Sequence, residues 1–194
     1  MKIVIIKYNA GNIQSVSFAL ERLGIDFHIT DDPEEIKSAD KIIFPGVGEA
    51  STTMNYLCDR KLDELIVGLK QPLLGVCLGM QLMCEYSEEN DTKCLGIFNE
   101  SVTLFQPTLD RKVPHMGWNN MTLSDSWLDP ALENQFAYFV HSYYVPVNPF
   151  TSAITEYGIP FSAAMHRDNF YAVQFHPEKS AAAGELVLKS FLKI

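Results

Sequence analysis

A cysteine between two glycines is the residue of this 194-residue chain best suited to nucleophilic chemistry. The string Gly75-Val76-Cys77-Leu78-Gly79 has the form G-x-nucleophile-x-G, in which the glycines permit a sharp turn from a strand into a helix. Such a turn places the thiol at a helix N-terminus, which favours the thiolate, and aims the Leu78 amide at a developing oxyanion. A structural cysteine that ends a core strand beside two packing glycines has the same pattern. The motif therefore indicates acyl transfer only if a base accompanies it.

The string His176-Pro177-Glu178 supplies that base. It follows the apolar run Tyr171–Phe175, so His176 should project from a strand end, the edge at which open α/β sheets bind ligands. Glu178 would fix the imidazole tautomer while the other ring nitrogen faces the thiol. A solvated histidine beside a surface glutamate is the alternative for this string taken alone. With Cys77, it predicts a catalytic triad of Cys77, His176 and Glu178.

A second loop can complete an oxyanion hole. The string Pro45-Gly46-Val47-Gly48 follows an expected strand, and its glycines let the backbone turn an amide inward. The predicted oxyanion donors are the amides of Val47 and Leu78. The loop lacks the spacing and the lysine of a phosphate-binding loop, and the remaining alternative is a tight turn with no function.

The elements that would position these residues follow an α/β pattern. The first half alternates expected strands and helices at Lys2–Ile6, Asn12–Leu23, Asp26–Thr30, Pro33–Ala39 and Lys41–Phe44. Helical stretches through Ser51–Lys70 and a buried parallel strand at Pro72–Val76 come next. Strands that extend or flank the same sheet are expected at Ser101–Phe105, Phe136–Val145, Ser152–Glu156 and Phe170–Phe175, before a last helix at Ala181–Ile194. The prediction is one α/β domain over residues 1–194, with a mixed, mostly parallel sheet flanked by helices and the nucleophile at a strand-to-helix elbow.

Composition limits the class of function. The chain is 47% hydrophobic and 20% charged, as in an ordinary globular domain, and its net charge of −9 argues against a nucleic-acid partner. No stretch approaches membrane-spanning length. The four cysteines show neither a zinc-site spacing nor a disulfide framework. We expect a cytoplasmic protein with no metal, no cofactor and no membrane partner.

These strings together resemble the class I glutamine amidotransferases over essentially the whole chain. Cys77 and His176 are about a hundred residues apart (176 − 77 = 99), and further matches are Gly11-Asn12, Pro45–Gly48, Pro114–Asn119 and His141–Tyr143. Lys7-Tyr8-Asn9 departs from the Asp-Tyr-Gly that related subunits often show. The resemblance implies that Cys77 attacks the side-chain amide of glutamine, that His176 protonates departing ammonia and then activates water, and that a γ-glutamyl thioester forms.

The resemblance also implies a substrate pocket and a partner. Residues expected to bind glutamine are Gly48, Gln81, Glu89, Ser142 and Tyr143. Residues expected near the partner interface are Asn12, Trp118, Tyr138 and Lys179. The Pro114–Asn119 string is similar to that of family members that form a heterodimer with a cyclase subunit of the (β/α)₈-barrel type and supply it with ammonia in histidine biosynthesis. The alternatives are the same glutaminase serving another synthase, such as one that aminates a cell-surface sugar, and an inactive binding subunit.

Overall fold

The computed structural model describes residues 1–8, 12–109, 111–124 and 127–194. Strands and helices alternate through the first part of the chain, which confirms the expected pattern: β1 (Ile3–Ile6), α1 (Ile13–Arg22), β2 (Phe27–Thr30), α2 (Pro33–Lys37), β3 (Lys41–Phe44), α3 (Ala50–Asp59), α4 (Leu62–Gly68) and β4 (Leu73–Val76). The remainder is mostly β: α5 (Leu78–Leu82), β5 (Cys84–Ser87), β6 (Thr92–Lys93), β7 (Phe98–Leu104), β8 (His115–Asn120), β9 (Thr122–Leu123), η1 (Pro130–Leu132), β10 (Phe136–His141), β11 (Tyr143–Tyr144), β12 (Thr151–Glu156), β13 (Pro160–Arg167), β14 (Phe170–Val173), η2 (Pro177–Lys179) and α6 (Ala181–Lys193).

The main sheet has the strand order β2-β1-β3-β4-β14-β13-β12-β9. The strands from β2 to β14 pair in parallel, and the others join antiparallel, so the expected mixed sheet is confirmed. Two smaller sheets, β10-β8 and β11-β7-β5-β6, flank it. Since β4 and β14 are neighbours, Cys77 and the His176 segment leave the sheet at the same edge.

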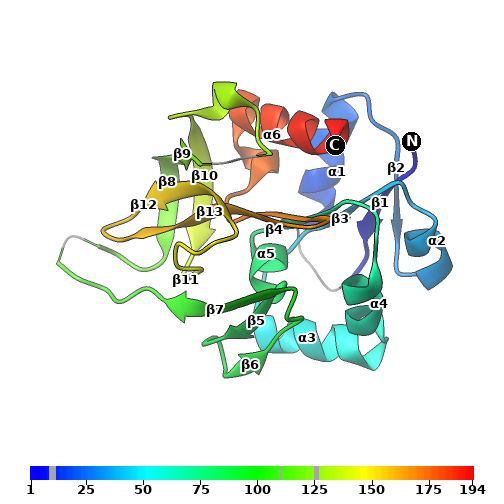
Figure 1. Cartoon of the computed structure of the whole chain (residues 1–194), viewed down its shortest axis with the longest axis horizontal. Coiled ribbons are helices and arrows are strands. Elements are labelled where there is room, and N and C mark those ends of the chain that lie inside the picture. The colour runs from blue at the N-terminus through cyan, green and yellow to red at the C-terminus, as the bar shows by residue number, and fades with distance from the viewer. Residues whose placement is uncertain (9–11, 110, 125–126) are drawn as a thin grey trace.

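Helices cover both faces of the main sheet (Figure 1). Side chains of β1 alternate between the faces, as successive residues of a strand must. Ile3 and Ile5 belong to the apolar cluster that includes α1 and α6, whereas Val4 and Ile6 belong to the cluster that includes α2 to α5. Each such fully buried side chain contributes roughly 1.5–3 kcal/mol of transfer free energy, so this double core makes a rigid support for the loops at the strand ends.

The helical stretches expected through Ser51–Lys70 are α3 and α4, and Lys61 between them adopts a left-handed φ of 56°. Other details differ from the sequence prediction. The run Phe136–Val145 is divided at Ser142, and its two strands join different sheets. Strand β13 was not expected, because it begins with a proline and carries serine and alanines, which are poor indicators of a strand.

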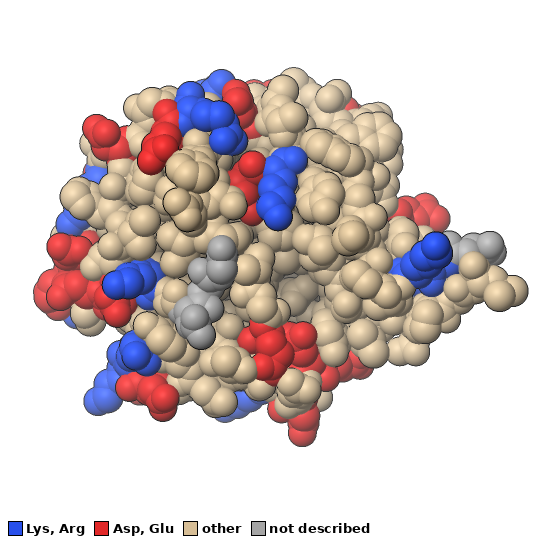
Figure 2. All heavy atoms as spheres, turned by 180° about the vertical axis from the view of Figure 1, so that it is seen from behind, with Lys and Arg blue, Asp and Glu red and all other residues tan. Residues whose placement is uncertain are grey.

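On one face of the molecule, positive and negative side chains are intermixed (Figure 2). On the face seen in Figure 2, Lys and Arg side chains lie singly or in small groups among acidic and neutral residues. In the described part of the chain, none of the helices is both long enough and apolar enough to cross a membrane. Across the same residues, no cluster of three or more His, Cys, Asp or Glu side chains could hold a metal ion.

Candidate active site

Cys77 occupies a strained turn between β4 and α5. Its φ of 52° and ψ of −106° lie in a region that non-glycine residues rarely adopt. The Cys77 amide donates to the Val173 carbonyl at 2.8 Å, so the end of β14 holds the turn in place. The strained φ belongs to Cys77 itself, and the flanking glycines leave room for the sharp turn from β4 into α5. A Cβ on Gly79 would lie 2.1 Å from the Phe44 carbonyl oxygen, so glycine here permits α5 to approach β3 closely.

His176 and Glu178 form a buried hydrogen-bonded pair. His176 Nδ1 lies 2.7 Å from Glu178 Oε1, and each side chain is only 1% exposed. The His176 amide donates to the Tyr138 carbonyl at 2.9 Å, which ties the loop after β14 to β10. Both groups are thus held in one orientation, as a base and its orienting carboxylate must be.

Asn12, which was expected near a partner interface, lies beside this pair. It is buried, and its Nδ2 donates to Glu178 Oε1 at 3.2 Å. The start of α1 carries Asn12 to this position. Its sequence neighbour Gly11, and Asn9 of the departing Lys7-Tyr8-Asn9 string, lie outside the described residues.

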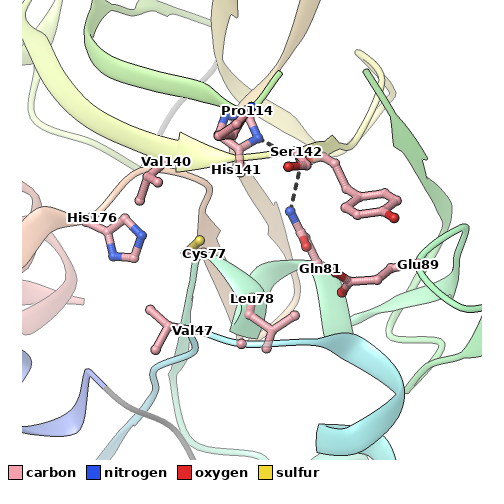
Figure 3. A pocket seen from close by; sticks show the side chains of 12 residues that line it. Val47, Cys77, Leu78, Gln81, Glu89, Pro114, Val140, His141, Ser142 and His176 are labelled. Carbon is pink, nitrogen blue, oxygen red and sulfur yellow. Dashed lines mark hydrogen bonds between the residues drawn. The ribbon is translucent and has the colours of Figure 1, made fainter. Parts of the chain in front are cut away.

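The remaining ring nitrogen of His176 faces the nucleophile. The imidazole and the Cys77 sulfur point toward one another (Figure 3), and Nε2 has no hydrogen-bond partner among the described residues. Burial alone lowers the pKa of His176, but the Cys77 sulfur and the Glu178 carboxylate outweigh it and raise the pKa from 6.5 to about 10. The ring is therefore a strong acceptor for the thiol proton, as nucleophilic catalysis requires.

The loop after β3 does not present both expected oxyanion donors to the cavity. The Leu78 amide donates to the Gly46 carbonyl oxygen at 3.3 Å. In a trans peptide the N–H points opposite to the C=O, so the Val47 amide points away from Leu78. The Pro45 carbonyl also accepts a hydrogen bond from the buried Tyr8 hydroxyl, and burial raises the pKa of that hydroxyl well above its usual value. Rotation of the Gly46–Val47 peptide would be needed to bring the two amides together.

A cavity of about 430 Å³ opens above Cys77. Its lining includes all five residues expected to bind glutamine, together with Cys77, His176, Val47 and Leu78: Gly48, Gln81, Glu89, Ser142 and Tyr143. Gln81 Nε2 donates to the Tyr143 carbonyl at 2.9 Å, and Glu89 Oε2 accepts from the Ala50 amide at 2.7 Å. Burial raises the pKa of Glu89. The volume is within the range of roughly 300–1,000 Å³ typical of small-molecule sites.

Several residues near the cavity had been given no role from the sequence. Pro114, Val140 and His141 line it. Gln174 is completely buried, and its Nε2 lies 3.7 Å from Cys77 Sγ. One signal could have identified Gln174, because it is a lone amide within the apolar run Tyr171–Phe175. A buried polar side chain in such a run must have a partner.

Three of the expected interface residues lie together. Trp118 on β8 is paired in register with Tyr138 on β10, and their rings make an edge contact at 6.1 Å between centroids. Lys179 Nζ lies 5.9 Å from the Tyr138 ring centroid. Large apolar side chains stay exposed on these two strands: Met116 at 63%, Trp118 at 53% and Phe136 at 56%. These exposed side chains form one contiguous apolar face, which is typical of binding surfaces.

Comparison with known proteins identifies the family of the chain. Residues 4–194 match the family described as glutamine amidotransferase class-I. The chain belongs to the class I glutamine amidotransferases.

Relatives that match over the full length have a more specific description than the family. A protein of Bacteroides fragilis strain YCH46, described as imidazole glycerol phosphate synthase subunit HisH, is 58% identical over 196 residues, which cover 100% of both chains. A protein of the same description from Vibrio parahaemolyticus is 45% identical over 203 residues, covering 100% of this chain and 98% of that one. A crystal structure described as glutamine amidotransferase has a TM-score of 0.75 at 17% identity, with 98% of this chain and 97% of that chain covered. The structure of PurLQS from Thermotoga maritima has a TM-score of 0.69 at 13% identity, with 99% and 97% covered. These two structures bear on the fold alone.

Proposed function

We propose that this chain is the glutaminase subunit of an imidazole glycerol phosphate synthase, in which Cys77, His176 and Glu178 release ammonia from glutamine. One observation carries the proposal: a buried His176–Glu178 hydrogen bond of 2.7 Å aims a free imidazole nitrogen at a cysteine on a strained elbow. The cavity beside that cysteine contains the five residues proposed to bind glutamine. The subunit description of the 58% and 45% identical relatives supports the choice of synthase.

The reaction follows from the positions of the three side chains. His176 Nε2 takes the Cys77 proton, and the sulfur adds to the side-chain carbonyl carbon of glutamine. When the tetrahedral adduct collapses, the C–N bond breaks, and His176 returns its proton to the leaving ammonia. His176 then removes a proton from water, whose oxygen attacks the thioester, and glutamate and the Cys77 thiol are released. Glu178 stabilises the imidazolium formed in each half of the cycle.

The same proposal includes a resting state with an incomplete oxyanion hole. The Leu78 amide donates its hydrogen bond to the Gly46 carbonyl and is not available to an oxyanion, and the Val47 amide points away. One absent oxyanion donor reduces the rate by about 10²–10³. A partner that binds more tightly to the rotated loop would shift the loop to the active state. Ammonia would then be released only when an acceptor protein is present.

A cyclase subunit of the (β/α)₈-barrel type is the proposed partner, in a heterodimer. The apolar face of Met116, Trp118, Phe136 and Tyr138, with Lys179 beside it, suits a protein surface. Val140 lies on the same strand as Phe136 and Tyr138 and lines the cavity, so a protein docked on this face would lie close to the ammonia that leaves Cys77. The complex is proposed to be cytoplasmic, where a reactive thiol stays reduced.

The test is reconstitution with candidate partners. The purified chain is mixed with the barrel cyclase of the same genome, and glutamate and imidazole glycerol phosphate are measured with glutamine as the only nitrogen source. Equimolar glutamate and product support the proposal. Glutamate release that is stimulated only by a different synthase, such as one that aminates a cell-surface sugar, would move the chain to that pathway. Absence of glutamate with every partner, while Cys77 resists a glutamine analogue that alkylates thiols, would contradict a glutaminase.

A further inference from the structure

The side-chain amide of Gln174 is buried. The Tyr143 carbonyl, acting through Gln81, fixes the direction in which the oxygen and the NH₂ group of this amide point. Tyr143 O can only accept, and Gln81 Nε2 lies 2.9 Å from it, so the NH₂ group of Gln81 must point toward Tyr143. The same NH₂ group lies 3.0 Å from the amide of Gln174. Because Gln81 donates there too, Gln174 must present its oxygen to Gln81. Its NH₂ group then points at Cys77 Sγ, 3.7 Å away.

The carbonyl that sets this polarity is itself held from the other side. His141 Nδ1 lies 2.7 Å from Tyr143 O and must donate to it, so His141 Nε2 is an acceptor. His115 Nδ1 lies 3.0 Å from that nitrogen and therefore donates, which leaves His115 Nε2 to accept from Asn119 Nδ2 at 3.3 Å. The other hydrogen of Asn119 Nδ2 goes to the Glu156 carbonyl at 2.9 Å.

Every member of this chain of hydrogen bonds has one consistent role. The Tyr143 and Glu156 carbonyls can only accept, and both histidines must be neutral for each to donate from one ring nitrogen and accept at the other. Burial lowers the pKa of His115 to about 4 and that of His141 to about 3, so both rings are neutral at physiological pH. The amide flip of Gln174, which would present its oxygen to the sulfur, would break the contact with Gln81 and leave two buried groups unpaired.

We propose that Gln174 is a thiolate-stabilising residue, whose N–H donates to Cys77 Sγ and holds the sulfur in place for proton transfer to His176. This role rests on the proposed glutaminase function. A neutral donor beside a buried anion favours the charged form without competing for the proton, unlike a lysine. It complements His176, which takes up the proton that leaves the sulfur.

The experiment compares Gln174→Met, which keeps the length of the side chain but has no N–H, with wild type. Alkylation of Cys77 by iodoacetamide is followed by mass spectrometry of the peptide that contains it, because exposed Cys58 also reacts. We expect alkylation at neutral pH to slow by about 10-fold or more, the factor that corresponds to one hydrogen bond to a charged group. The midpoint of the pH profile should move to higher pH. Gln71→Met is the matched control, since Gln71 Nε2 donates to the Ile36 carbonyl far from the cavity, and its profile should equal that of wild type.

A second variant guards against misfolding of the first. Gln174→Glu keeps the shape and the contact with Gln81 but presents an oxygen to the sulfur, so its alkylation should slow further as the new carboxyl ionises. Wild-type alkylation profiles in both folded variants would overturn the role of Gln174, even if the wild-type chain hydrolyses glutamine with its partner. Failure of the wild-type chain to hydrolyse glutamine, with the shifted profiles still present, would instead reject the glutaminase and leave the hydrogen bond to Cys77 supported.

Discussion

Gly184 in α6 positions the catalytic pair without touching it. A Cβ at this residue would lie 1.9 Å from the Pro177 carbonyl oxygen, and ordinary contact begins at 3.4 Å. Gly184→Ala must therefore move α6 and η2 apart by about 1.5 Å (3.4 − 1.9 = 1.5). Pro177 stands between His176 and Glu178, so part of that displacement reaches the 2.7 Å hydrogen bond of the pair.

The expected loss is large for a substitution of one methyl group. A misplacement of about 1 Å can reduce catalysis about 10²-fold, and we expect that reduction in glutamate release by the chain with its cyclase partner. Overpacking of this kind also costs about 1–3 kcal/mol of unfolding free energy. For a domain of this size, that lowers the melting temperature by roughly 2–4 °C for each kcal/mol.

Gly68→Ala is the matched control. Gly68 ends α4, and a Cβ there would have no atom within 4 Å. Replacing a helical glycine by alanine in open space should leave glutamate release unchanged and raise stability by up to about 1 kcal/mol. If Gly184→Ala keeps wild-type glutamate release and melting temperature, the close packing of α6 on η2 does not support the catalytic pair.

Three further predictions concern the catalytic pair, the loop and the buried histidines. Glu178→Gln should slow glutamate release less than His176→Ala, because the carboxylate only orients and stabilises the imidazolium, whereas the imidazole transfers the protons; equal losses in folded variants would contradict this division. Glutamate release should be slow for the chain alone, faster with the cyclase and fastest when the cyclase holds its acceptor, whereas equal rates would exclude gating by the Gly46–Val47 peptide. The pKa of His141 is lowered to about 3 in the folded chain, so between pH 6.5 and about 3 only the unfolded chain takes up a proton at this ring. The fold therefore loses stability as the pH falls through this range. By chemical denaturation, unfolding free energy should drop by about 2 kcal/mol from this group between pH 7 and 5, and by less in His141→Asn.

Much of the fold could be predicted because its signals are local. The apolar runs of β1, β3 and β4 and the amphipathic pattern of α1 need only neighbouring residues to be recognised. The division at Ser142 could not be predicted in this way, since the strands on either side of it pair with distant partners on β8 and β7. Strand β13 is likewise stabilised by its neighbours β12 and β14 and not by its own composition.

The residues of the site likewise differ in whether a local sequence pattern identifies them. Cys77, His176 and Glu178 were identifiable because each lies in a short string with a chemical purpose. Asn12 could not be placed against Glu178, 166 residues away, from any local pattern. The orientation of the Gly46–Val47 peptide also cannot be predicted from the sequence, because the same residues can adopt either orientation. Only the contact with the Leu78 amide shows which orientation the structure has.

Replacement of the nucleophile tests the proposed function most directly. Cys77→Ala is assayed in complex with the cyclase, first with glutamine and then with an ammonium salt as the nitrogen source. If Cys77 forms the thioester, the variant makes no product from glutamine but makes product from ammonium at the wild-type rate, because the covalent step is lost while the partner's chemistry is untouched. Glutamine-dependent product formation by Cys77→Ala would contradict the assignment of the nucleophile and, with it, the proposed mechanism.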